Sequence, residues 1–180
     1  YAGKGTLEDL TPYMEKDGVS KDDYFSAGME AYSYDGKVMA MPMRLGAMIM
    51  LYNKDLFDKN GIPYPTDQWT WEDFHNAALK ITNKQDGVFG VQGVGTWWAN
   101  YMAYVESFGG SLMTEDHTKF NLDSPESIKG LKFMQDLIYK DKVAPLASDI
   151  QKGVDLWTSG KIGMLVDGPW HILSAIANIK

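Results

Sequence analysis

The segment Lys161-Ile-Gly-Met-Leu-Val-Asp-Gly-Pro-Trp170 decides how this sequence is interpreted. Its apolar run over residues 162–166 has the length of a strand and ends at Asp167 and Gly168. Pro169 stands where a helix would begin, a position that tolerates proline because its missing N–H would have no partner inside the helix. We therefore expect a strand, a tight turn and a helix, with the indole of Trp170 at the corner.

A rigid indole at such a corner suits a ligand with a flat apolar face and polar edges, such as a sugar. From this segment alone, burial of Trp170 in the core is the simpler explanation, because tryptophan is mostly buried in any fold. The choice between a core residue and a cleft residue depends on the rest of the chain.

Composition excludes several function classes. The chain has 180 residues, is 44% hydrophobic and 23% charged, and fits an ordinary globular protein. A net charge of -7 argues against a nucleic-acid partner, which would need a basic face. No apolar run approaches the roughly 20 residues of a membrane span. The absence of cysteine excludes disulfides, thiolate chemistry and cysteine-ligated metals.

Strands and helices alternate from residue 45 onward, which predicts an α/β domain with a mostly parallel sheet and helices on both faces. Residues 1–44 are too poor in apolar periodicity for a core of their own, and we expect them to be the fringe of another lobe, with a crossing near 44–50. The chain begins at Tyr1 without an initiator Met or a signal peptide, so we expect a segment of a longer protein.

Periodicity and turn signals predict the individual elements. Asp35-Gly36 predicts a tight hairpin, and Thr70-Trp-Glu-Asp73 predicts a capping box at a helix start. The expected strands cover residues 38–43, 45–53, 88–94 and 162–166. The expected helices cover residues 21–31, 70–81, 97–108, 124–138, 154–159 and 170–179.

Aromatic content is unusual, with six Trp, ten Tyr and seven Phe. Trp69 with Trp71, and Trp97 with Trp98, stand in loop-like contexts. Trp97-Trp98 follows a strand end and opens a helix, as Trp170 does. Because consecutive helical residues point roughly 100° apart, we expect one indole of this pair to be buried and the other, Trp97, to face a cleft. Burial of both is the alternative.

Three polar residues are candidates for the same cleft. Asp167 either accepts ligand hydroxyls outside the carboxyl end of its strand or caps the following helix, and the cap is favoured. His171 either donates into the cleft or lies on the helix surface. A lone Arg44 is costly to bury unpaired, so it either reaches solvent or lines a polar crevice beside the crossing segment.

Catalytic and metal signals are weak. The sequence has no phosphate-binding loop, no nucleophile elbow and no His-Glu-x-x-His helix, and its three histidines have no ligand spacing. We predict no metal and no cofactor. Glu106 and Asp167 are the one carboxylate pair considered for glycoside hydrolysis, and nothing in the sequence places them together.

Several motifs, taken in order, carry a family resemblance. They are Tyr52-Asn-Lys-Asp-Leu-Phe-Asp-Lys-Asn-Gly-Ile-Pro63, Trp69-Thr-Trp-Glu-Asp-Phe74, Phe108-Gly-Gly110, Asn121-Leu-Asp-Ser-Pro-Glu126 and Gly160-Lys-Ile-Gly-Met-Leu-Val-Asp-Gly-Pro-Trp170. The set resembles the family 1 extracellular solute-binding proteins of ABC sugar importers, the group of maltose-binding protein. Each motif is soft by itself, whereas the ordered set covers essentially the whole chain.

The resemblance implies a fold of two periplasmic-binding-protein-like lobes of type II with a sugar held between them. By that pattern residues 1–44 are the tail of lobe 1 and residues 45–180 are most of lobe 2, truncated relative to the full protein. It implies a non-catalytic substrate-binding component that captures a sugar or oligosaccharide and delivers it to the membrane permease. Its location would be extracellular, as a membrane-anchored lipoprotein or in the periplasm.

The resemblance also sharpens the site. Trp170 matches the stacking aromatic of the Gly-Pro-Trp motif, and Trp97 falls where the family places a ligand contact. The predicted ligand-binding set is Trp170, Trp97, Arg44, Trp98, Asp167 and His171. The alternatives are a carbohydrate-active enzyme and a cell-surface domain that binds protein through its aromatic patch.

Overall fold

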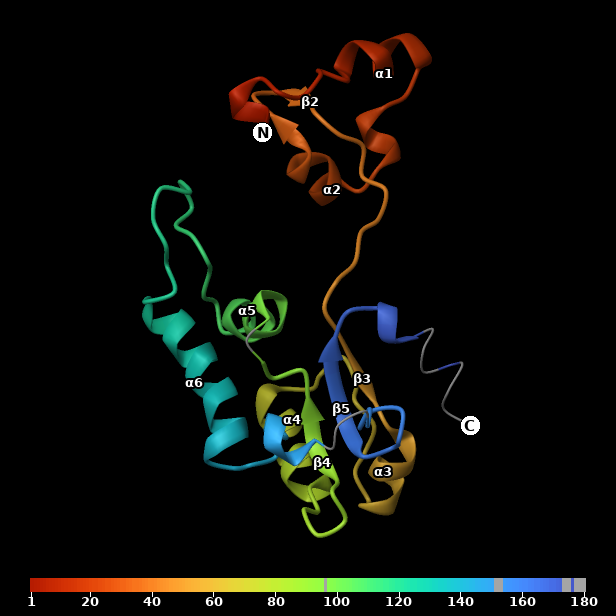
Figure 1. The fold of residues 1–180 in the computed structure, drawn as a ribbon, viewed down its shortest axis with the longest axis vertical. Coiled ribbons are helices and arrows are strands. Elements are labelled where there is room, and N and C mark those ends of the chain that lie inside the picture. The colour runs from red at the N-terminus through yellow and green to blue at the C-terminus, as the bar shows by residue number, and fades with distance from the viewer. Residues whose placement is uncertain (96, 151–153, 173–175, 177–180) are drawn as a thin grey trace. The chain divides into compact units, whose positions relative to one another are not determined.

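The computed structural model describes the chain except residues 96, 151–153, 173–175 and 177–180 (Figure 1). Two compact units divide it, Tyr1–Gly46 and Ala47–Lys180. Their assignment to two lobes of a larger protein stays a prediction.

The first unit is a set of short elements around a small methionine-rich core. Met14, Met29 and Val38 are its buried residues. Asp35 (φ 48°) and Gly36 (φ 76°) form the tight turn of the predicted hairpin, since both have the positive φ that such a turn requires. The elements are η1 (Ala2–Lys4), α1 (Thr11–Asp17), η2 (Lys21–Asp23), α2 (Ser26–Ala31), β1 (Ser33–Tyr34) and β2 (Lys37–Val38).

Two predictions for this unit are wrong in detail. The helix expected over 21–31 is interrupted, because Tyr24 adopts extended backbone and packs on the methionine core. The strand expected over 38–43 is confined to β2, and residues 39–48 form no strand. Pro42 lies in that stretch and has no N–H to offer a ladder.

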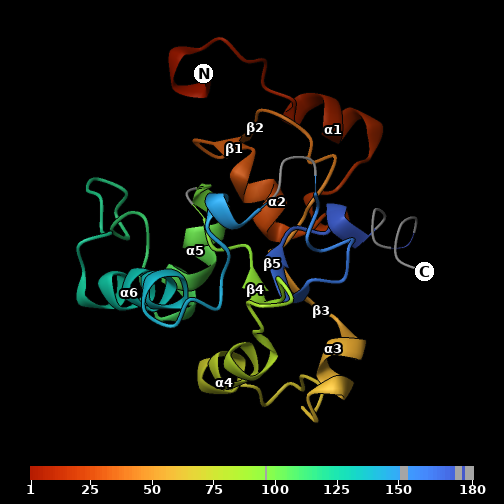
Figure 2. The ribbon, with the colours of Figure 1, turned by 60° about the horizontal axis from the view of Figure 1, so that its bottom comes forward.

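The second unit contains a three-stranded sheet in the order β3 (Ile49–Tyr52), β5 (Ile162–Asp167), β4 (Phe89–Gln92) (Figure 2). The central strand β5 is buried from Ile162 to Val166, as expected of a strand with both faces covered. It pairs in parallel with β4 and antiparallel with β3. The α/β class is confirmed, but the sheet is mixed rather than mostly parallel, because β3 runs toward α3 while β4 and β5 run in the opposite direction.

Helices surround this sheet, and their N-termini follow the predicted capping signals. The helices are α3 (Lys54–Lys59), α4 (Trp71–Ile81), α5 (Trp98–Ser107), α6 (Pro125–Tyr139) and the short η3 (Ala147–Asp149). The capping box of α4 is confirmed: the Asp73 N–H donates to Thr70 Oγ1 (3.2 Å) and the Thr70 N–H to Asp73 Oδ2 (2.9 Å). The Ser124 hydroxyl caps α6, whose first residue is Pro125.

The helix expected over 154–159 is a run of turns instead. Asp155 Oδ1 accepts the backbone N–H of Trp157 (2.9 Å), an alternative to helical bonding that short polar side chains offer. Only the start of the helix expected over 170–179 can be compared, since most of it lies outside the described residues, and Trp170 to Ile172 are helical.

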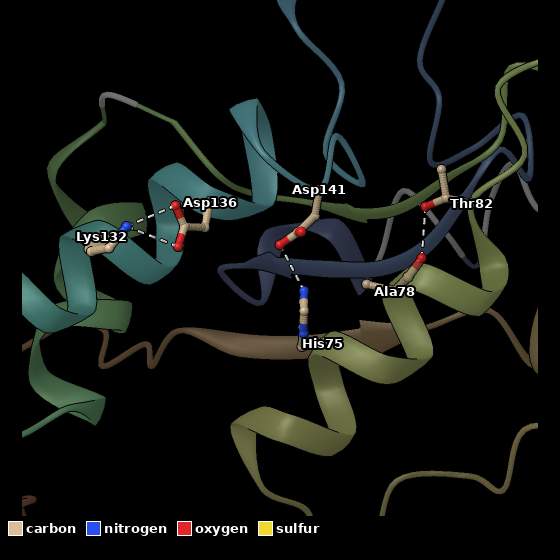
Figure 3. A network of polar contacts seen from close by, with 6 residues as sticks. All are labelled: His75, Ala78, Thr82, Lys132, Asp136 and Asp141. Carbon is tan, nitrogen blue, oxygen red and sulfur yellow. Dashed lines mark hydrogen bonds and ion pairs between the residues drawn. The ribbon is translucent and has the colours of Figure 1, made fainter.

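The main core lies between the sheet and α4, α5 and α6, and includes Phe74, Tyr104, Leu137 and Met164. A smaller core contains Phe89, Leu156, Trp157, Ile162 and Leu165. A polar contact links α4 to the segment after α6, where His75 Nε2 lies 2.8 Å from Asp141 Oδ2 (Figure 3). None of the helices in the described ranges has the length and hydropathy of a membrane span.

Candidate functional site

Three indoles meet where α5 and the Gly-Pro-Trp turn begin, and Trp97, Trp98 and Trp170 are called the tryptophan cluster below. Trp97 is the N-cap residue of α5 and Trp98 is the first helical residue. The ring centroid of Trp97 lies 6.2 Å from that of Trp98 and 5.6 Å from that of Trp170, and each pair of planes is inclined by 65°. The structure therefore brings together three residues that are 73 positions apart at the extremes (170 − 97).

All three indoles are exposed, with relative exposures of 43% for Trp97, 62% for Trp98 and 54% for Trp170. The expectation that one of Trp97 and Trp98 is buried is wrong. The buried residues of α5 begin with Ala99 and Asn100, directly after the two tryptophans. Trp97 is the N-cap and has extended backbone (φ -67°, ψ 129°). Burial of Trp170 in the core is excluded as well.

Gly168 is the seat of the Trp170 indole. A Cβ atom at Gly168 would lie 2.0 Å from Cη2 of that ring, a distance at which the two atoms would overlap. The ring thus packs against the backbone of Gly168, and the rest of the indole is open to solvent. Gly93, directly after β4, lets the backbone approach β5 closely, because a Cβ there would lie 1.8 Å from the Val166 carbonyl oxygen.

Asp167 and His171 support the same turn. Asp167 Oδ1 accepts the Gly168 N–H (2.7 Å), and its Oδ2 lies 3.1 Å from His171 Nε2. Asp167 therefore stabilises the turn that leads to Pro169. Over the described start of the helix, Trp170 to Ile172, no backbone N–H bonds to its side chain, so the favoured helix cap is not formed there. Their side chains keep 20% and 29% of their surface exposed, respectively. A role of either residue in ligand binding stays a prediction.

A crevice of about 310 Å³ with both polar and apolar walls opens at the carboxyl ends of β4 and β5. Gln92, Gly95, Asn100 and Asp167 are among its lining residues. The Asn100 Nδ2 group donates to the Val166 carbonyl (3.2 Å) and so ties the first turn of α5 to β5. Gln92 Oε1 is buried and has no hydrogen-bond partner within the described part of the chain.

Sequence reasoning missed Gln92 and Asn100. The signal for Gln92 was a polar residue directly after the apolar strand residues 88–91. No local signal pointed to Asn100, whose partner is a backbone carbonyl 66 residues away.

Arg44 belongs to the first unit, whereas the other five predicted site residues belong to the second. It is exposed and lines a pocket of about 520 Å³ together with Asp22, Asp23, Tyr24 and Phe25. Arg44 reaches solvent, which is one of the two sequence alternatives, whereas the lining of this pocket is mainly apolar and includes Phe25 and Met43. A role for Arg44 in a polar ligand crevice stays a prediction. Its presence beside the tryptophan cluster stays a prediction.

Glu106 and Asp167, the carboxylates considered for glycoside hydrolysis, belong to different elements, α5 and β5. Glu106 is exposed in the last turn of α5, about 12 Å along the helix axis from Trp98. Asp167 follows Val166, to which the first turn of that helix is tied. Asn100, which makes this tie, lies about 9 Å along the helix axis from Glu106. Among the described residues no group of three or more His, Asp or Glu side chains gathers as a metal site would require.

Comparison with known proteins adds to this geometry. The profile of "Bacterial extracellular solute-binding protein" matches residues 1–179. A substrate-binding protein of an ABC transporter from Listeria monocytogenes, solved in complex with cycloalternan, is 36% identical with a TM-score of 0.78, over 94% of this chain and 44% of that one. A solute-binding protein from Thermotoga lettingae, bound with alpha-D-tagatose, is 28% identical with a TM-score of 0.73, over 98% of this chain and 46% of that one.

An arabinooligosaccharide-binding protein of Bacillus subtilis is 30% identical over 77% of this chain and 31% of its own length. The chain thus spans less than half the length of the relatives it matches. The profile match, which covers nearly every residue, and the agreement in fold confirm the resemblance read from the sequence motifs. The chain belongs to the family of bacterial extracellular solute-binding proteins.

Proposed function

We propose that this protein is the substrate-binding component of an ABC importer that captures a sugar or oligosaccharide outside the cell and delivers it to the membrane permease. The observation that carries the proposal is the tryptophan cluster: three exposed indoles gathered at strand ends in a chain of this family. Relatives solved with cycloalternan and with alpha-D-tagatose support a carbohydrate as the ligand.

The chemistry of the cluster fits a carbohydrate. An indole face is apolar and flat, so it covers the C–H face of a sugar ring, while its edge N–H remains available as a donor. Exposed indoles that gather in one place mark a surface that a partner covers, because water solvates them poorly. The adjoining crevice contributes the Gln92 and Asn100 side chains for the hydroxyl groups at the edge of the ring.

Capture would follow the two-lobe mechanism of the family. A ligand that binds the closed arrangement more tightly than the open one shifts the population toward closure by its differential affinity. The permease would recognise the closed form. This role requires no chemistry on the sugar, and we propose a non-catalytic protein without a cofactor.

Calorimetric titration of the full-length protein encoded by its gene tests this proposal. The ligands are neutral gluco-, arabino-, xylo- and galactosaccharides of one to six rings. Replacing Trp170→Ala should weaken binding of the best ligand by at least about tenfold, the loss expected for one stacked aromatic contact. Trp170→Phe should retain most of the affinity because it keeps an aromatic face.

Phe120→Ala is the matched control, because Phe120 is 74% exposed but lies in the loop before α6, away from the cluster in sequence. This control should bind like the parent protein. Unchanged affinity in Trp170→Ala would remove the cluster from the site, and absence of binding across the whole panel would refute carbohydrate capture. Release of smaller sugars during incubation would refute a non-catalytic role.

A further inference from the structure

Beyond the proposed function, we infer that a helix from the chain that follows residue 180 in the full-length protein packs into an apolar groove between α5 and α6. This α5–α6 groove has a volume of about 730 Å³, and its walls are mainly apolar. It lies where α6 runs beside α5 at the edge of the second unit (Figures 1 and 2). Its apolar lining residues include Tyr101, Leu122, Ile128, Leu131, Ile138 and Tyr139.

The helix α6 has apolar residues on two sides, and one side is already packed. A Cβ at Gly130 would lie 2.8 Å from the Tyr104 carbonyl oxygen, so α6 and α5 are in close contact on that side. The other side, called the outer stripe below, consists of positions i, i+3, i+10 and i+11 of the helix, which are Ile128, Leu131, Ile138 and Tyr139. Ile128 is 52% exposed and Tyr139 is 62% exposed. Because a helix that is apolar on most of its circumference is normally buried, α6 needs a second partner along the outer stripe.

The protein's own chain is the occupant that fits best. The sequence covers 44% of the Listeria relative and 46% of the Thermotoga relative, so more than half of a protein of that length lies outside it. The second unit, Ala47–Lys180, includes the last residue, and consecutive elements of a chain usually pack close together. A tethered segment also has a high effective concentration. Walls this apolar are typical of permanent contacts, which resemble a core cut in half, and not of transient partners.

The construction of the groove favours a helix as the covering element. None of its lining residues in the described part of the chain belongs to a strand, so an extended segment would find no strand to pair with. Its backbone groups would stay unpaired, whereas a helix satisfies its own. The outer stripe runs over eleven positions (139 − 128), which is about 16 Å of helix. A helix of about three turns with one apolar face therefore covers it.

Photo-cross-linking in the purified full-length protein, at low micromolar concentration, identifies what covers the groove. The test variant is Ile128→benzoylphenylalanine. The matched control is Lys129→benzoylphenylalanine, because Lys129 is exposed on the same helix and points about 100° further around it. After irradiation, peptide mass spectrometry of the monomer should join position 128 to a peptide beyond residue 180. Position 129 should give no such adduct.

The covering helix should also stabilise the protein. Ile128→Ser should lower the melting temperature of the full-length protein by about 3 °C or more, because a covered apolar side chain is lost, and Lys129→Ser by less than about 1 °C. Adducts confined to residues 1–180, adducts between two copies, no adduct at position 128, or equal temperature shifts would each overturn the inference. Neither measurement uses a ligand, so such a failure leaves the proposed function standing.

Discussion

Trp71 and Trp98 are both the first residue of a helix, yet they belong to opposite surroundings. Trp71 opens α4 and contacts the rings of Phe74, Tyr104, Phe108 and Phe133 at centroid distances between 5.2 and 5.9 Å. Trp98 opens α5, contacts the ring of Trp97, and leaves 62% of its surface exposed. Trp71 packs between α4, α5 and α6, whereas the Trp98 side chain lies mostly in solvent.

The two helix starts are also stabilised in different ways. Thr70 and Asp73 form a local capping box before α4, whereas the N-cap of α5 is Trp97, which makes no side-chain cap. The first turn of α5 depends instead on the distant hydrogen bond from Asn100 to the Val166 carbonyl. Because the hydrogen bond of Asn100 holds the start of α5, Trp97 and Trp98 need not supply a cap, and their side chains are exposed. The comparison teaches that exposure at equivalent positions distinguishes an indole that packs in the core from one whose surface is accessible to a ligand.

The largest effect is expected for Trp71→Ala. Removing this ring from among four aromatic neighbours should lower the free energy of unfolding by about 3–5 kcal/mol, the usual cost of such a truncation in a core. Trp98→Ala should change it by less than about 0.5 kcal/mol, as surface substitutions do. Denaturant unfolding of both variants measures the difference. Similar losses for both would contradict the division into structural and binding indoles.

Asn100→Ala should lower the free energy of unfolding by about 1–2 kcal/mol, because it removes a buried hydrogen bond that ties α5 to β5. It should also weaken saccharide binding by loosening the start of α5. The matched control is Asn60→Ala, which removes an exposed Asn Nδ2 bond to the Leu56 carbonyl (2.8 Å) in α3. Equal stability of the two variants would show that α5 does not depend on this tie.

Gly168→Ala should displace the Trp170 ring from its seat, because the added Cβ cannot coexist with the indole. We expect saccharide affinity to fall about tenfold, as for loss of the stacked contact, with little change in unfolding free energy. The double variant Gly168→Ala with Trp170→Ala should be no weaker than Trp170→Ala alone, since Gly168 acts through that ring. Additive losses would assign Gly168 a separate role.

The smallest effect concerns the cap of α4 and its pH dependence. The Thr70 hydroxyl and backbone N–H both bond to Asp73 and lower the pKa of that carboxyl, the side-chain bond contributing more. Because the folded pKa is below the unfolded one, near 4, the stabilisation is present above about pH 4 and is lost as pH falls through the folded pKa.

Thr70→Ala should therefore raise the pKa of Asp73 and lower the melting temperature by about 3 °C at neutral pH. Carboxyl-carbon NMR titration and thermal unfolding at two pH values measure both effects. An unchanged titration of Asp73 would show that the capping box does not set its pKa.

Local signals predicted the second unit well where side chains close in sequence bond to the free backbone N–H groups of a helix start, or where an apolar run marks a buried strand. The capping box at Thr70, the cap at Ser124 and the buried strand ahead of Asp167 are all in place. The errors arise where tertiary contacts decide. The helix expected over 21–31 is interrupted at Tyr24 because this residue packs on the methionine core. The antiparallel direction of β3 was missed because the apolar pattern of a strand does not encode its direction.

The candidate site was predictable to the same extent. The three indoles share a sequence context, a helix start after a strand end, and the topology of the sheet brings such positions together at one edge. The exposure of one of the Trp97-Trp98 pair was mispredicted, because Trp97 is the N-cap with extended backbone and the 100° spacing of helical residues does not apply between it and Trp98. The crevice residues Gln92 and Asn100 depend on neighbours far away in sequence.

The most direct test follows the six indole N–H signals of the full-length protein by NMR during titration with the tightest-binding saccharide of the panel. The account predicts that the largest shifts belong to Trp97, Trp98 and Trp170, and that Trp69, Trp71 and Trp157 move little. Larger shifts at Trp69 and Trp71, with the tryptophan cluster unmoved, would contradict it.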